Sequence, residues 1–264
     1  KWGVVGVKVD SYGRDDQPFV RFINKMVEKA AEYQLLIDFH GAYKPTGIRR
    51  TWPNFLTSEA VLGLEYAKFS SIPGRPSPTH NVTIPFTRML AGPMDYTPGY
   101  FGTIDLGFTV KGTRAHQLAM YVVYESPLQM VSDTPMAYEG QVGIDFLERV
   151  PATWDETRVV AGKPGAYVSI ARRAGDEWYV GTMTNEEPRV LEIPLDFLGD
   201  DEYIAYTYED GHGEPCAGED HDPAGAAAAP ANTRMRREIV NRHTVLIARL
   251  ASGGGQAVRL TPRS

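Results

Sequence analysis

The first forty residues carry the pattern that most restricts the fold, because two apolar segments flank an amphipathic helix pattern. Residues 2–10 and 35–40 are short apolar runs typical of buried strands. Between them, Asp16 suits a helix N-cap and Pro18 suits a first turn. The apolar positions that follow have the helical period: Phe19, Phe22, Ile23, Met26, Val27 and Ala30. Two strands joined through a helix by short links lie parallel with a right-handed crossover, so we expect a βαβ unit.

More strand-like segments follow near residues 60, 87 and 128, with helix patterns at 115–124 and 142–147. Together with the segments near residues 3 and 35 they fit the later strands of a (β/α)8 TIM barrel, an α/β fold. The first segment reads as a strand that needs neighbours on both sides, so we expect the preceding strands in sequence upstream of this chain. Long loops at 41–58 and 70–85 are of the kind that usually carries function.

From about residue 151 the pattern changes to short alternating segments separated by Gly, Asp and Asn turns. We expect strands at 167–171, 178–182, 190–193, 203–208, 244–248 and 257–260. This spacing predicts an all-β antiparallel sandwich. The predicted organisation is therefore 1–150 for the C-terminal part of a catalytic barrel and 151–264 for a C-terminal β-sandwich domain. The Ala- and Pro-rich tract at 223–231 has the composition of a mobile loop.

Charge and motif content exclude several classes of protein. The net charge of −6 and the scattered Lys and Arg residues argue against nucleic acid as a partner. No run of 18 apolar residues is present, so we expect no membrane span. The single cysteine, Cys216, cannot form an internal disulfide, and the histidines lack zinc-site spacing. Neither a G-x-S-x-G elbow nor a phosphate-binding Gly loop occurs.

Acidic residues at predicted strand ends are the candidate catalytic groups, because barrel active sites form there. Asp10 ends the strand that contains Lys8, and the period of two directs both side chains to one side. A neighbouring cation keeps a carboxylate ionised, as a nucleophile requires. A strand-end Asp that caps the next turn explains Asp10 equally well.

Glu59 and Glu65 form a second candidate pair. If the segment is extended, both carboxylates face one side, and if it is helical they diverge. Two carboxylates at one site bind a hard cation or raise one another's pKa. Two exposed glutamates on a helix are nevertheless the commoner case.

His40 lies at another predicted strand end and opens a Gly- and Pro-containing loop, which favours substrate contact over a core role. Trp52 and Tyr96 could stack on a sugar ring, although aromatic residues in such positions are as often part of a core.

These stretches together resemble glycoside hydrolase family 97 over essentially the whole chain. The matching runs are residues 6–10, 40–47, 50–54, 59–65, 85–99 and 112–114. The most specific is the long run that ends in Asp-Tyr-Thr-Pro-Gly at 95–99. The resemblance implies an N-terminal β-sandwich, a (β/α)8 barrel and a C-terminal β-domain, of which this chain holds the later part.

The resemblance also implies a mechanism. Inverting members of this family have Glu directly after the strand-end His, and here that position is Gly41. Retaining members have an Asp nucleophile after the Lys-containing strand, and Asp10 occupies that place. By the same match Glu65 is the general acid/base, and Glu59 and Glu65 are at a Ca²⁺ site. We also expect Lys8 and His40 to contact substrate.

The resemblance therefore predicts a retaining α-glycosidase, most often an α-galactosidase, that acts on an oligosaccharide or α-glycoside. Periplasmic or secreted localisation is an expectation from the family alone. Two alternatives stay open at this point: an α-glucosidase of the same family, and a non-catalytic carbohydrate-binding protein. The latter predicts the loss of one carboxylate, whereas both Asp10 and Glu65 are present.

Overall fold

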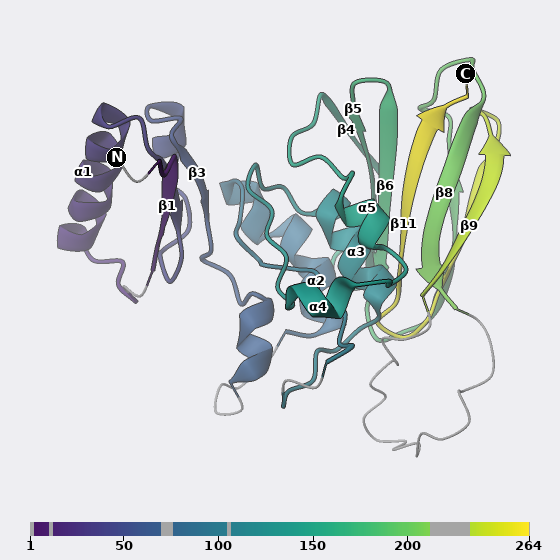
Figure 1. Cartoon of the computed structure of the whole chain (residues 1–264), viewed down its shortest axis with the longest axis horizontal. Helices are drawn as coiled ribbons and strands as arrows, with labels where there is room; N and C mark the ends of the chain where they lie inside the picture. The colour runs from purple at the N-terminus through teal and green to yellow at the C-terminus, as the bar shows by residue number, and fades with distance from the viewer. Residues whose placement is uncertain (1–2, 11–12, 70–75, 105–106, 212–232, 264) are drawn as a thin grey trace.

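The chain is arranged in three layers, which are a small parallel sheet with one long helix, a middle layer of short helices, and two antiparallel sheets (Figure 1). The computed structural model describes residues 3–10, 13–69, 76–104, 107–211 and 233–263. Cys216 and the tract at 223–231 lie outside the described residues. Among the described helices, none has both the length and the apolar character needed to cross a bilayer.

The parallel sheet confirms the predicted βαβ unit. Strands β1 (Gly6–Val9), β2 (Leu36–Phe39) and β3 (Phe55–Ser58) pair in the order β1-β2-β3, all parallel. Helix α1 (Gln17–Glu32) joins the first two strands, and its N-cap Asp16 accepts a hydrogen bond from the Phe19 amide at 3.1 Å. The apolar stripe of α1 packs with side chains of β2 and β3 in one buried cluster: Phe19, Ile23, Val27, Ala30, Ile37, Phe39 and Phe55. The carboxyl ends of all three strands therefore meet at one edge.

The middle layer consists of short helical elements. They are η1 (Ile48–Arg50), η2 (Leu64–Lys68), α2 (Pro78–Thr83), η3 (Ile84–Phe86), η4 (Arg88–Ala91), α3 (Arg114–Val123), α4 (Pro135–Tyr138) and α5 (Ile144–Leu147). Helices α3 and α5 agree with the predicted helix patterns at 115–124 and 142–147.

The strands predicted near residues 87 and 128 are wrong. Residues 84–91 form consecutive 3₁₀ turns, with the Thr87 amide bonded to the Ile84 carbonyl at 3.1 Å. Residues 128–131 do not pair with a strand. Two of their carbonyls accept hydrogen bonds from side-chain hydroxyls instead: Ser126 donates to Leu128 at 2.9 Å, and Tyr121 donates to Met130 at 2.8 Å. The segment that does extend the parallel sheet is Met94, which forms a single parallel bridge with Ser58.

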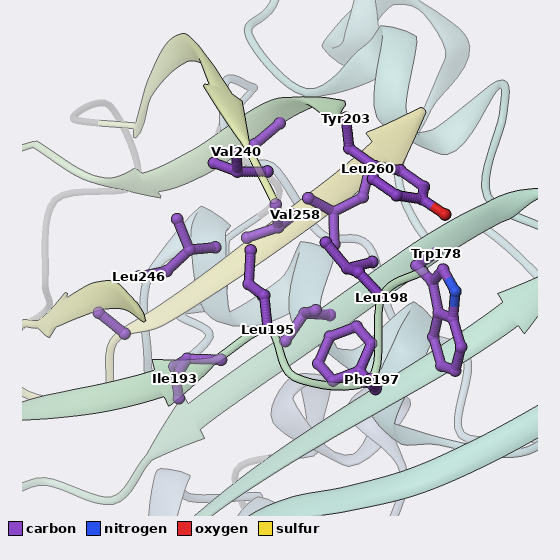
Figure 2. Packing of buried hydrophobic residues seen from close by; sticks show 14 of the residues in the cluster. Trp178, Ile193, Leu195, Phe197, Leu198, Tyr203, Val240, Leu246, Val258 and Leu260 are labelled. Carbon is purple, nitrogen blue, oxygen red and sulfur yellow. The ribbon is translucent and has the colours of Figure 1, made fainter. Parts of the chain in front are cut away.

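The C-terminal part contains two antiparallel sheets. The larger one comprises β4 (Glu156–Lys163), β5 (Tyr167–Ala174), β6 (Glu177–Thr184), β8 (Tyr203–Asp210), β9 (Thr233–Val240) and β11 (Gly255–Pro262), in the order β4-β5-β6-β11-β8-β9. The smaller one pairs β7 (Arg189–Pro194) with β10 (Val245–Leu250). All six strands predicted after residue 151 are present, whereas β4 and β9 were not predicted. Apolar side chains of both sheets share one core, which Figure 2 shows around Trp178, Phe197 and Val258.

Helix α3 connects the layers. All ten of its residues are buried, and it lies against β6 and β11 (Figure 1). Two hydrophobic clusters combine residues from both sides of residue 150; one of them joins Leu64 and Met120 to Ile170. The division into 1–150 and 151–264 stays a prediction.

Candidate active site

A pocket of about 340 Å³ opens at the carboxyl edge of the parallel sheet. Lys8 and Asp10 reach it from the end of β1, and His40 reaches it directly after β2. Glu65 and Lys68 enter from η2. The remaining wall comes from Leu64 of η2 and from later loops: Thr97, Tyr100, Phe108, Met130, Val131 and Ser132. Four of the predicted site residues, Lys8, Asp10, His40 and Glu65, therefore line one cavity.

His40 is the centre of the hydrogen-bond network. Its Nδ1 lies 3.0 Å from Asp95 Oδ2, and its Nε2 lies 3.0 Å from Glu59 Oε1 and 3.2 Å from Glu65 Oε2. Burial favours the neutral ring, but the hydrogen bonds with Asp95 and Glu59 outweigh it and raise the pKa of His40 to about 10. The imidazolium then donates from both nitrogens to the surrounding carboxylates.

Behind His40 lies a buried pair of aspartates next to a lysine. Lys8 Nζ is 2.5 Å from Asp95 Oδ2 and 3.8 Å from Asp38 Oδ2. Burial, together with the negative charge of Asp95, raises the pKa of Asp38 well above its usual range. Hydrogen bonds from His40 and Lys8 overcome the effect of burial at Asp95 and lower the pKa of that carboxyl. One aspartate of the pair thus keeps its proton at neutral pH while the other is ionised.

Glu59 and Glu65 both lie next to His40 Nε2, although Glu59 directly follows β3 and Glu65 belongs to η2. Glu59 is 3% exposed, and its Oε2 accepts from the Gly41 amide at 2.6 Å. Glu65 accepts from Lys68 Nζ at 3.0 Å, and this bond lowers the pKa of Glu65 against the opposing effect of partial burial. Neither a continuous strand nor a continuous helix joins the two glutamates, because a turn at Ala60 (φ +38°) separates β3 from η2.

Ligand atoms of His40, Glu59 and Glu65 all lie within 4.8 Å of one another. The two carboxylates supply the oxygen donors that Ca²⁺ prefers, and a hard cation between them would relieve their mutual repulsion. The structure therefore brings together both residues that the sequence predicted as metal ligands.

Trp52 and Tyr96, for which both sugar stacking and a core position were open, lie outside the pocket lining. Tyr96 is 1% exposed and donates its hydroxyl to Asn81 Oδ1 at 2.6 Å, so it belongs to the core rather than to a sugar platform. Trp52 packs against the cluster between α1 and the parallel sheet. The aromatic residues that line the pocket are Tyr100 and Phe108, whose ring centroids are 5.2 Å apart.

Sequence reasoning also missed the roles of Asp38 and Asp95. A signal was present for Asp38, because an acidic residue inside an apolar strand is rarely buried without a partner. Asp95 lies in the most specific motif run, but its contact with Lys8 spans 87 positions of sequence.

Comparison with known proteins identifies the family of this chain. Residues 1–61 match the family model "Glycoside hydrolase 97", and residues 153–261 match "Glycosyl-hydrolase 97 C-terminal, oligomerisation". A retaining alpha-galactosidase of Bacteroides thetaiotaomicron is 39% identical over 98% of this chain and 38% of its own length. A probable retaining alpha-galactosidase of Streptomyces bingchenggensis is 36% identical over 74% of this chain and 29% of its own.

Solved structures give the same result. A glycoside hydrolase family 97 enzyme from Pseudoalteromonas sp. strain K8, in complex with acarbose, superimposes with a TM-score of 0.82 at 35% identity, covering 95% of this chain and 38% of that one. A beta-arabinopyranosidase superimposes with a TM-score of 0.76 at 29% identity, covering 97% and 39%. This chain thus spans well under half the length of these relatives. The two family models and the similarity over almost the whole chain show that it belongs to glycoside hydrolase family 97.

Proposed function

We propose that this chain carries the catalytic carboxylates of a retaining α-glycosidase whose substrate is an α-galactoside. The observation that carries the proposal is that Asp10 and Glu65 line the same pocket of about 340 Å³. A retaining glycosidase needs two such carboxyl groups on opposite sides of one glycosidic bond. The names of the two curated relatives support galactose as the sugar.

In this mechanism Asp10 attacks the anomeric carbon and forms a covalent glycosyl ester as the bond to the leaving oxygen breaks. Glu65 gives its proton to that oxygen, and then takes a proton from the water that hydrolyses the ester. Two inversions at the anomeric carbon give net retention. The mechanism predicts a separation of roughly 5–5.5 Å between the two carboxyl groups, against roughly 6.5–9.5 Å for an inverting pair.

The general acid needs a change in the surroundings of Glu65. Asp10 shares the pocket with the ammonium group of Lys8. Glu65 must hold a proton when the glycosidic bond breaks, whereas its hydrogen bond with Lys68 favours the ionised form. A sugar that enters between Lys68 and Glu65 would remove one of the bonds that favour the ionised form, and the proton affinity of Glu65 would rise.

We also propose a Ca²⁺ site at Glu59 and Glu65. The fit rests on the convergence of two carboxylates at one point and on the oxygen character of these donors. A bound ion would supply positive charge that orients the acid/base carboxylate. His40 lies within hydrogen-bond distance of both glutamates, so it would help to hold Glu59 and Glu65 in place.

Chelation tests the metal. We expect excess chelator to abolish hydrolysis by the full-length enzyme and added Ca²⁺ to restore it, because Glu65 would lose a neighbouring charge that fixes its position. Turnover of an aryl α-galactoside is the measurement, with Mg²⁺ addition as the control. Unchanged turnover in excess chelator would remove the calcium site from the proposal.

We propose that the parallel strands belong to a (β/α)8 barrel and that the two antiparallel sheets form a sandwich. Apolar side chains on β1 and β2 support the first part, since Val7 is 41% and Leu36 is 40% exposed. Side chains of this kind need cover, which neighbouring barrel strands would provide. The greater length of the relatives leaves room for those strands.

An α-glucoside is the second candidate substrate. A Pseudoalteromonas family 97 enzyme with an E480Q substitution was solved in complex with panose, a glucose trisaccharide, and superimposes on this chain with a TM-score of 0.82. Discrimination between the two sugars rests on one axial or equatorial hydroxyl.

Proton NMR of the first-formed sugar tests the reaction directly. We expect the full-length enzyme to release the α-anomer first from an aryl α-galactoside. Initial release of the β-anomer would mean inversion and would remove Asp10 from the role of nucleophile. If the enzyme cleaves only the aryl α-glucoside, the proposed mechanism still stands and the substrate is an α-glucoside instead of an α-galactoside.

A further inference from the structure

Arg88, in η4, donates hydrogen bonds to backbone carbonyls of two separate segments, residues 58–60 and 92–93. Its Nη2 donates to the Ser58 carbonyl at 2.7 Å and to the Glu59 carbonyl at 3.1 Å, while Nε donates to the Ala60 carbonyl at 3.0 Å. The other segment contributes two more acceptors. Nη1 donates to the Gly92 carbonyl at 2.9 Å, and Nη2 donates to the Pro93 carbonyl at 3.2 Å.

This arginine has an unusual set of partners. Among the residues that the structure describes, no carboxylate lies within 4.0 Å of its guanidinium. Burial lowers the pKa of Arg88 to about 10, so the group stays charged at neutral pH. A half-buried charge without a counter-ion is costly unless its donors are satisfied, and here five carbonyl oxygens satisfy them.

The two segments that Arg88 ties together carry site residues. The first is the turn after β3, in which Glu59 is followed by Ala60 at a φ of +38°, a conformation that costs energy for a residue other than glycine. The second leads through Gly92 to Asp95. The Ser58 carbonyl contacts both Arg88 and the second segment, because it also accepts a hydrogen bond from the Asp95 amide at 3.2 Å.

We propose that Arg88 is a positioning residue that holds Glu59 and Asp95 in register, so that both carboxylates meet His40. The inference rests on the proposed function, because it gives Arg88 a role in calcium binding and hydrolysis through Glu59 and Asp95. Arg88 lies outside the pocket lining and does not act on the substrate itself.

The geometry explains why lysine cannot replace this arginine. A guanidinium offers five donors in a fixed plane, whereas an ammonium offers three donors from one atom. Arg88→Lys therefore keeps the charge but loses simultaneous contact with the two segments. Arg88→Gln loses the charge and most of the donors.

A matched control is available in Arg172 on β5. It is 5% exposed, and its Nη2 donates to a single carbonyl, that of Val123, at 3.3 Å. Burial lowers its pKa as well, and it does not line the pocket. Arg172→Gln thus removes a buried guanidinium without touching the segments that hold Glu59 and Asp95.

The experiment compares the full-length wild type with Arg88→Gln, Arg88→Lys and Arg172→Gln. We measure kcat and KM on an aryl α-galactoside, the Kd for Ca²⁺ by calorimetry, and the melting temperature. Loss of a residue that orients metal ligands typically costs about 10–100-fold in affinity or activity, so we expect such a loss in kcat and in Ca²⁺ affinity for Arg88→Gln. We expect Arg88→Lys to lie between Arg88→Gln and the wild type, and Arg172→Gln to lose only thermal stability.

Wild-type kcat and Ca²⁺ affinity in Arg88→Gln would overturn the inference, as would equal losses in Arg172→Gln. If Arg88→Gln does not fold, kcat and the Ca²⁺ affinity of Arg88→Lys decide the question.

Amide hydrogen exchange separates this inference from the proposed function. If the wild type neither binds Ca²⁺ nor cleaves a glycoside, the proposed function fails. Faster exchange confined to residues 58–60 and 92–95 in the Arg88 variants would still support positioning, and unchanged or uniformly faster exchange would overturn it.

Discussion

Asp38 occupies the position where a carboxylate costs most, since it is 1% exposed in the middle of an apolar strand. Burial and the negative charge of Asp95 raise its pKa, so Asp38 favours the neutral form while Asp95 is ionised. Asp95 contacts two cationic groups, Lys8 and His40. The neutral acid thus lets Asp95 hold Lys8 and His40 together at the back of the pocket.

The proposed role of Asp10 as nucleophile gives a prediction at the scale of one residue. Asp10→Gly should lower kcat of the full-length enzyme on the order of 10³-fold or more, because the nucleophile is lost. Azide should restore cleavage of an activated aryl α-galactoside and yield the β-galactosyl azide, since the small anion attacks from the face that Asp10 has vacated.

The control is Asp15→Asn, an exposed aspartate of the loop that follows β1, which should leave kcat unchanged. Product analysis by NMR decides the outcome. Azide without effect, or an α-azide product, would contradict the assignment of Asp10.

At the scale of elements, the contact between α3 and the larger antiparallel sheet depends on close approach. A Cβ on Gly181 of β6 would lie 2.6 Å from the Ala119 carbonyl oxygen and 2.8 Å from Val122 Cβ. Both atoms belong to α3, which is buried along its whole length and has no room to move away. The helix and the sheet therefore pack at a distance that only glycine allows here.

Gly181→Ala should destabilise the protein by about 1–3 kcal/mol, the usual cost of overpacking. Gly199→Ala is the matched control, because its Cβ would meet its nearest neighbour, the Tyr203 hydroxyl, at 3.6 Å. Urea unfolding of the full-length variants measures the difference. Equal free energies of unfolding for Gly181→Ala and wild type would show that α3 can shift.

Elements also differ in how well local sequence predicts them. The apolar period identifies α1 and α3 because each buries a regular stripe or a whole surface. Residues 84–91 are apolar enough for a strand, but Pro85 removes a backbone donor and the carbonyl at Ile84 bonds locally to Thr87. A short apolar run does not distinguish these outcomes.

At the scale of the whole molecule, a buried hydrogen-bond chain links the candidate site to the antiparallel sheet. Tyr96, which follows Asp95, donates to Asn81 Oδ1 at 2.6 Å, and Asn81 Nδ2 lies 3.2 Å from His116 Nε2. His116 Nδ1 lies 3.0 Å from the carbonyl oxygen of Gly254, next to the start of β11. The three side chains are at most 1% exposed. The chain of bonds couples the loop that carries Asp95 to the C-terminal sheet.

His116 makes stability depend on pH in a defined direction. Burial lowers its pKa to about 4, although the bond to Gly254 partly opposes the shift, whereas an unfolded histidine titrates near ~6.5. Between these values the unfolded chain binds more protons than the folded one, so the free energy of unfolding falls as the pH falls. The full shift corresponds to about 3 kcal/mol, lost between about pH 6.5 and pH 4.

His116→Gln should remove this part of the pH dependence. The exposed His243 provides the control, since His243→Gln should keep the wild-type slope. Urea unfolding at pH 7 and pH 4.5 gives the comparison. Parallel pH profiles for wild type and His116→Gln would show that His116 is not buried in the neutral form.

The sequence by itself determined the βαβ unit, helices α3 and α5, six of the C-terminal strands, and the identity of the pocket residues Lys8, Asp10, His40 and Glu65. Periodicity and strand-end position are local properties, and the family motifs are contiguous runs, so one sequence contains them. Only the tertiary structure decided that Asp95 lies next to Lys8 and His40, that Arg88 bonds to the segments of Glu59 and Asp95, and that Glu59 and Glu65 converge across a turn. Their contacts join residues far apart in the chain, such as Lys8 and Asp95, and no local pattern records which distant segments will pack together.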